Sequence, residues 1–335
     1  MREISSENRN WRVITGKNLV FFVLGVFLVF FLLRQIDMKE LVHQITGVRL
    51  EFFLFGGGIY ILKVCFRSLR MNRISAEIAL PYWRTLRLSL ATSLATQIFP
   101  FKLGELSYVY LLNREKSTSS AQGLSALIVI RMMDLLAIGM LYLVVVLSLH
   151  SPQSGMQSRQ ALLFLGLLGG SFGVLFFVSH MSLNFLYRER QKFFNEGKSF
   201  SRLLDWLGRF FVAFKTYRPE QIALWMGLAL LEWMANYVIF YLLLWGMGAP
   251  INPFQTITAV TFAAIASALP VNMVGSFGSQ EAGWTAGLLM VHVDQQIAIT
   301  TAFSTHILTL GYIAFFGILA WISYLLSAGV NLHPE

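Results

Sequence analysis

The chain has 335 residues, of which 56% are hydrophobic and 13% charged, and its mean hydropathy is +0.62. This composition excludes an ordinary soluble domain and indicates an integral membrane protein. The net charge of +9 does not indicate a nucleic-acid partner, because the basic residues fall in short segments between apolar runs. The single cysteine, Cys65, excludes an intrachain disulfide and a thiolate metal cluster.

Six apolar runs approach the length of about 20 residues that a helix needs to cross a bilayer. They are residues 18–34, 49–66, 121–149, 161–180, 221–247 and 296–325. The first run follows a basic stretch and has no small-residue cleavage site after it, so we expect a retained helix and not a removed signal peptide. The sequence therefore predicts an all-α polytopic membrane protein with about six transmembrane helices.

Two further apolar segments, 85–112 and 254–292, are interrupted by proline, glycine and a carboxylate. The residues at these breaks are Pro100, Gly104 and Glu105 in the first segment, and Pro270, Gly275, Gly278 and Glu281 in the second. An arm from 85 to 99 would be roughly 22 Å long, which is short of a hydrocarbon core of about 30 Å. We therefore expect two re-entrant pairs of half-helices, a pattern that marks the binding sites of transporters.

The distribution of basic residues supports this topology. With a cytoplasmic N-terminus and both broken segments re-entrant, only Arg34, Lys39, Arg49 and Arg159 fall in loops on the outer side. Each half of the chain then holds two spans, a re-entrant pair and a third span, and the halves have opposite orientations. The expected architecture is an inverted repeat in the cytoplasmic (inner) membrane, with both termini in the cytoplasm.

The predicted repeat divides the chain into three parts. Residues 1–180 contain the first membrane repeat, and residues 181–220 form a cytoplasmic amphipathic linker. Residues 221–335 hold the remainder of the second repeat, which begins at the 161–180 span. The spacing of polar residues agrees with an inverted repeat, because Arg131 follows Glu105 by 26 residues and His306 follows Glu281 by 25.

Several ionisable residues are predicted at similar depth in the membrane, where they would share a hydrated cavity. We expect them to bind the substrate; they are Glu105, Arg131, Asp134, Glu281, His306, Lys102 and Glu232. Structural explanations stay open: Arg131 and Asp134, at positions i and i+3, can neutralise one another, and the carboxylates that follow the breaks can cap helices. The functional alternative is that these carboxylates bind a cationic group or take up a proton.

Arg67 and Arg70 recur at the predicted cytoplasmic end of the second span, where they can meet lipid phosphates. Positive-inside anchoring explains them equally well. The sequence has no Walker loop, dinucleotide fingerprint, His-Glu-x-x-His helix or nucleophile elbow. We therefore expect no cofactor and no bound metal, and we do not expect an enzyme.

The motifs resemble the lysylphosphatidylglycerol synthase transmembrane-region family. The resemblance rests on the run Gln97 to Glu105, on Arg131-Met132-Met133-Asp134 and on Pro270 through Glu281, and it covers residues 15–325. It implies that Pro100, Gly104, Glu105, Arg131, Asp134, Pro270, Gly278 and Glu281 are functional. Val274, Ser276 and Phe277 depart from the glycine-richer family pattern, and His306 stands where an arginine is common.

The resemblance and the charge pattern together predict a lipid translocase of the flippase type. Its substrate would be a membrane lipid with a charged headgroup or a polyprenyl carrier, and a separate lipid-modifying enzyme could be its partner. Two alternatives remain. One is an intramembrane headgroup or glycosyl transferase with Glu105 or Asp134 as general base or metal ligand. The other is a non-catalytic partner of a lipid-modifying enzyme.

Overall fold

The computed structural model describes residues 34, 38–74, 80–99, 103–115, 120–148, 166, 218–268 and 274–329. All regular structure within these ranges is helical. The predicted spans at 18–34 and 161–180 lie outside the described residues apart from single positions, and so does nearly all of the 181–220 linker. The break residues Pro100, Lys102 and Pro270 also lie outside them.

Four long helices are apolar enough to cross a membrane, and they confirm four of the predicted spans. They are α3 (Leu50–Ile74), α6 (Ser120–Ser148), α9 (Pro219–Gly246) and α12 (Gln295–Gly329). The prediction ended the second span at residue 66, but α3 continues for two more turns. Arg67 and Arg70 are therefore part of this helix and do not belong to a cytoplasmic loop.

The first interrupted segment folds into α4 (Tyr82–Ile98), the short 3-10 turn η2 (Leu103–Glu105) and α5 (Leu106–Glu115). The chain turns back after Ile98, because Gly104 lies directly against the last turns of α4. A Cβ atom on Gly104 would be 2.3 Å from the carbonyl oxygen of Ala95 and 2.3 Å from the Cα atom of Thr96. The absence of a side chain therefore allows the break to approach the helix.

The second interrupted segment consists of α10 (Pro253–Ser267), η3 (Val274–Ser276) and α11 (Ser279–Met290). Its two helices pack antiparallel, and a Cβ atom on Gly283 would be 2.5 Å from the carbonyl oxygen of Phe262. The turn before α11 uses the left-handed backbone region, with φ angles of 75° at Gly275 and 100° at Gly278. Glycine adopts these angles without the strain that a side chain would cause.

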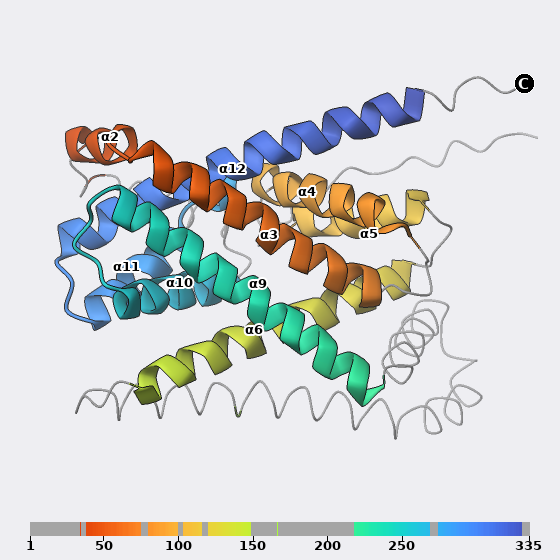
Figure 1. The fold of residues 1–335 in the computed structure, drawn as a ribbon, viewed down its shortest axis with the longest axis horizontal. Coiled ribbons are helices and arrows are strands. Elements are labelled where there is room, and N and C mark those ends of the chain that lie inside the picture. Colours follow the sequence, from red (N-terminus) through yellow and green to blue (C-terminus); the bar gives the residue numbers. More distant parts are fainter. Residues whose placement is uncertain are drawn as a thin grey trace, which may run out of the picture.

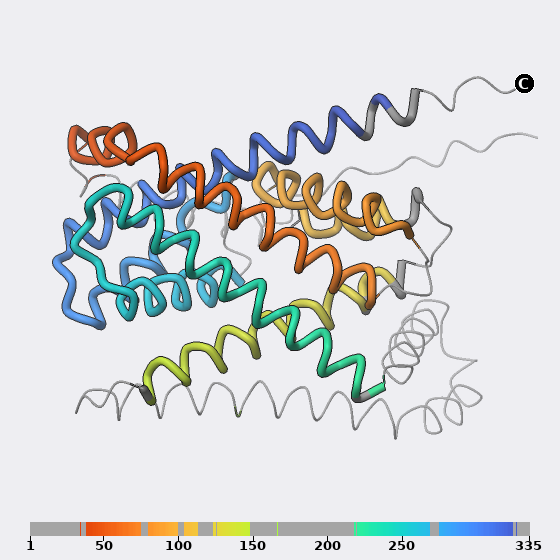
Figure 2. Tube along the Cα trace, in the orientation of Figure 1, coloured from red at the N-terminus to blue at the C-terminus, as the bar shows by residue number. Residues whose placement is uncertain are grey.

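The described elements follow the same order twice. In each half a long helix is followed by a short helix, a 3-10 turn, a second short helix and another long helix. The two leading long helices, α3 and α9, lie side by side in Figures 1 and 2 and run antiparallel. The amide of Arg49, before α3, donates to the carbonyl of Gly246 at the end of α9 over 3.0 Å, and Lys63 and Arg67 meet earlier positions of α9.

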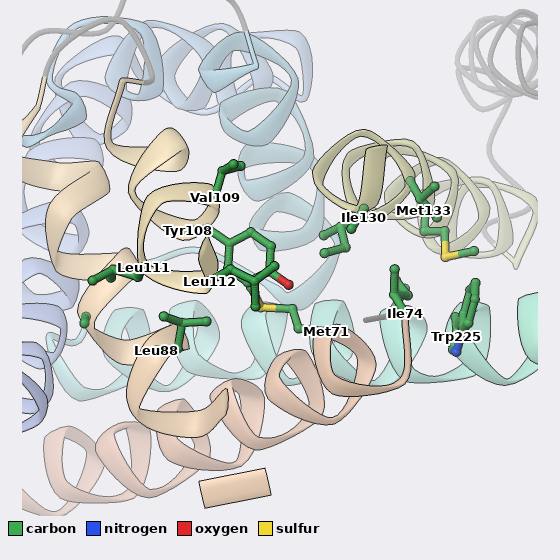
Figure 3. Packing of buried hydrophobic residues seen from close by; sticks show 14 of the residues in the cluster. Met71, Ile74, Leu88, Tyr108, Val109, Leu111, Leu112, Ile130, Met133 and Trp225 are labelled. Atoms are coloured by element: carbon green, nitrogen blue, oxygen red, sulfur yellow. The ribbon is translucent and has the colours of Figure 1, made fainter. Parts of the chain in front are cut away.

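Further contacts between the two halves are made by α12. Helix α12 packs along α4, and the short helix α2 (Met38–Thr46) packs on α12, where the hydroxyl of Ser304 donates to Gln44 over 3.1 Å. A hydrophobic cluster joins α3, α4, α5, α6 and α9. Figure 3 shows Tyr108 of α5 pointing toward Met71 and Ile130, which places this apolar packing beside the polar site described below.

Candidate functional site

Arg70 lies at the centre of a buried ion-pair network between three long helices. Its Nη2 atom donates to Asp134 of α6 over 2.6 Å and to Glu232 of α9 over 2.7 Å. The Arg70 side chain has no exposed surface, and both carboxylates are also buried. Its Nε and Nη1 atoms are buried and have no partner among the described residues. Arg70 therefore does not lie at a lipid-facing surface, in contrast to the position that the sequence suggested.

Arg67 extends the network toward α4. Its Nε atom donates to the second oxygen of Glu232 over 2.8 Å, and its Nη1 atom donates to the hydroxyl of Ser93 over 3.3 Å. Glu232 thus bridges two arginines from successive turns of α3, which explains how a carboxylate can be buried in an apolar helix. One turn earlier, Lys63 donates to Asn236 over 2.8 Å and continues the polar contact between α3 and α9.

Arg131 of α6 forms the other end of the network. Its guanidinium binds both oxygens of Glu105 at the end of η2, and its Nη1 atom lies 3.7 Å from Asp134. Arg131 was expected to pair with Asp134, but this is the longer of the contacts that Arg131 makes. Asp134 is bound more closely by Arg70. Arg131 is the most exposed member, with 46% of its side chain accessible.

A small cavity of about 60 Å³ lies between the arginines and helix α4. Four hydroxyl residues of α4 line one wall at positions i, i+3, i+4 and i+7, and they are Ser89, Thr92, Ser93 and Thr96. Arg67, Arg131, Glu105 and Asp134 line the cavity as well. Sequence reasoning missed the hydroxyl stripe, although its helical spacing was a signal that could have revealed it.

The second break carries a different pair, which does not line this cavity. Glu281, in the first turn of α11, contacts Nδ1 of His306 on α12 and accepts a hydrogen bond from the amide of Gly278 over 2.7 Å. Both side chains are almost fully buried. Glu105 thus contacts Arg131 and Glu281 contacts His306, so the two similar spacings in the sequence, 26 and 25 residues, correspond to two direct contacts.

The predicted site residues that the structure describes, which exclude Lys102, fall into two groups. The cavity network contains Glu105, Arg131, Asp134, Glu232, Arg67 and Arg70, whereas Glu281 and His306 form the second pair. Within the described ranges, no group of three or more histidine, cysteine, aspartate or glutamate side chains could hold a metal ion.

A family model described as the lysylphosphatidylglycerol synthase TM region matches residues 18–317, which is most of the chain. The chain belongs to this family. No curated protein matches it. The lysylphosphatidylglycerol synthase TM region, together with the long apolar helices, identifies a multi-pass membrane protein that acts in lipid metabolism or transport. The range that the family model matches includes both interrupted segments and every residue of the ion-pair network.

Proposed function

We propose that this protein is a lipid translocase of the flippase type in the cytoplasmic membrane. Its substrate would carry a charged headgroup or a polyprenyl chain, and the headgroup would pass through the polar site while the tails stay in the bilayer. The observation that carries this proposal is the network of three arginines and three carboxylates beside a cavity within apolar helices. Charged residues inside a membrane domain usually mark a substrate pathway.

The cavity offers suitable partners for a headgroup. The guanidinium groups of Arg67 and Arg131 can bind a phosphate, and the carboxylate of Glu105 can bind an ammonium group. The hydroxyl of Thr92 is buried and has no partner among the described residues, so it can donate to a bound oxygen atom. Because the site presents both charges, it suits a zwitterionic or an anionic headgroup better than an apolar ligand.

Passage of a headgroup requires the site to widen. A cavity of about 60 Å³ has room for only a few water molecules. In this proposal the elements that move are the two hairpins, α4–η2–α5 and α10–η3–α11, because each consists of short helices joined through a 3-10 turn. In this proposal both hairpins are re-entrant, the two halves form an inverted repeat, and alternating movement of the halves opens the site to each side.

The proposed function also implies an orientation in the membrane and a partner. Both termini would lie in the cytoplasm, where most basic loops are predicted. No cofactor is invoked, and the transported lipid leaves the site without covalent change. A separate lipid-modifying enzyme would supply or consume this lipid.

Transbilayer movement of labelled lipids tests the proposed function. The full chain is reconstituted in vesicles that contain fluorescent phosphatidylglycerol, phosphatidylethanolamine or a prenyl phosphate. We expect at least one of these lipids to cross faster than in empty vesicles. In the variant Arg131→Gln we expect the rate to fall about tenfold or more, because a charge-assisted contact of about 1.5–3 kcal/mol is lost.

The matched control is Arg49→Gln, which removes an arginine from an exposed ion pair with Glu51. This variant should move lipid at the wild-type rate. The translocase proposal fails if none of the three lipids crosses faster than in empty vesicles, or if Arg131→Gln is folded and fully active. Mass spectrometry of the same vesicles distinguishes a transferase, which would change the mass of the lipid.

A further inference from the structure

The Glu281–His306 pair lies apart from the cavity and is enclosed by protein. Its carboxylate has no exposed surface, and only 2% of the histidine side chain is accessible. One carboxylate oxygen accepts from the amide of Gly278 over 2.7 Å, and the other contacts Nδ1 of His306. The ring of Phe277 lies against the imidazole, with 4.6 Å between the ring centroids. The pair therefore joins the turn of the second break to α12.

The described elements around this pair provide no further charge to it. Helix α10 and turn η3 contain no titratable residue. Other titratable residues lie on α12 and on the elements packed against α11 and α12. In the described contacts, none of them forms an ion pair or a hydrogen bond with Glu281 or His306. These residues are Lys39, Glu40 and His43 on α2; Tyr82, Arg84 and Arg87 on α4; Glu220, Glu232, Tyr237 and Tyr241 on α9; and Tyr312 on α12.

Among the described residues the pair has no other charged partner, and this limits the charge that it can carry. An isolated net charge is costly in a buried, apolar environment, whereas an opposed pair of charges is tolerated. Glu281 and His306 have no net charge only when they hold one proton between them. Without that proton the pair carries a net negative charge, which only the amide of Gly278 and the N-terminus of α11 offset, and with two protons it carries a net positive charge.

The contacts indicate where the proton resides. Glu281 accepts from the amide of Gly278, so its carboxylate acts as an acceptor, and Nδ1 of His306 is placed to donate to it. The face of Phe277 beside the imidazole favours a positive charge on that ring. The second nitrogen, Nε2, is buried and has no partner among the described residues, so Glu281 is the one described hydrogen-bonding partner of the imidazole.

We infer that Glu281 and His306 form a proton-binding site, in which the carboxylate and the imidazole share one proton. The corresponding pair of the first half cannot do this. Arg131 is permanently charged, and it is accessible beside the cavity. The two breaks thus hold similar contacts with different chemistry: a permanent ion pair in the first half, and in the second half a pair whose charges depend on one shared proton. This inference concerns a different ligand and a different site from the proposed translocation.

Nitrogen-15 NMR of the full chain in lipid nanodiscs, with labelled histidine, tests the inference at pH 7. We expect one imidazole with both nitrogens protonated that disappears in His306→Asn. The same signal should be lost in Glu281→Gln, because the neutral amide no longer compensates the charge. The matched control, Glu105→Gln, removes the carboxylate of the other break and should leave the signal unchanged. If His306→Asn does not fold, a through-space contact with a labelled Phe277 ring assigns the signal in the wild-type protein.

Infrared spectroscopy completes the test, because the proton could reside on the carboxyl group instead. A carboxylic acid band that is lost in Glu281→Gln, together with a neutral His306, also supports one proton on the pair. The inference is overturned if the wild-type protein shows a neutral His306 and no such band. It is also overturned if the doubly protonated imidazole persists in Glu281→Gln. Neither readout depends on lipid movement, so failure here leaves the translocase proposal standing.

Discussion

Replacing Arg70 with methionine should lower the free energy of unfolding by about 3–5 kcal/mol, which is the usual cost of removing one partner from a buried ion pair. The reason is that Arg70 is fully buried and binds Asp134 and Glu232 with the same nitrogen atom. Its loss leaves Asp134 with Arg131 at 3.7 Å as its one described ion-pair partner, beside a hydrogen bond from the indole of Trp233, and removes one of the two arginines that bind Glu232. Thermal and denaturant unfolding of the purified protein in detergent micelles measures the effect.

The matched control is Arg73→Met, which changes an exposed arginine one turn further along α3. This variant should unfold close to the wild-type midpoint. Adding Asp134→Asn and Glu232→Gln to Arg70→Met should recover part of the lost stability, because no uncompensated charge then remains. Equal stability of Arg70→Met and Arg73→Met would contradict the central position of Arg70 in the network.

Gly104→Ala should destabilise the protein by about 1–3 kcal/mol, the usual cost of overpacking, and should also reduce lipid movement. The added methyl group would lie 2.3 Å from backbone atoms of Ala95 and Thr96, and backbone cannot rotate away as a side chain can. The turn must therefore move away from α4, and Glu105, the next residue, moves with it. Unfolding curves and the labelled-lipid assay measure the two effects on the same preparation.

Gly227→Ala is the control for this experiment, because a Cβ atom at Gly227 meets nothing within 4 Å. Alanine inside a helix is favoured over glycine by roughly 1 kcal/mol, so this variant should be at least as stable as the wild type. Unchanged stability and unchanged lipid movement in Gly104→Ala would show that the close contact of the break with α4 is not required.

The long helices were predictable because apolar runs of sufficient length have few alternatives in a bilayer. The interruptions near residues 100 and 270 were predictable as well, since glycine and proline there oppose a continuous helix. The boundaries were less accurate. The prediction ended the second span before Arg67, because charged residues are typical of span ends, but α3 continues through Arg67 and Arg70.

Amino-acid order along the chain was thus sufficient for the fold class, the two broken segments and most residues of the site. It was insufficient for the pairing of charges. The spacing within one helix predicted an ion pair between Arg131 and Asp134. In the packed structure Asp134 binds Arg70 instead, and Arg131 binds Glu105. Helix periodicity identifies only neighbours within one helix. A buried charge pairs with the opposite charge that helix packing brings closest. Here Glu105 is 26 residues from Arg131, and Arg70 is 64 residues from Asp134.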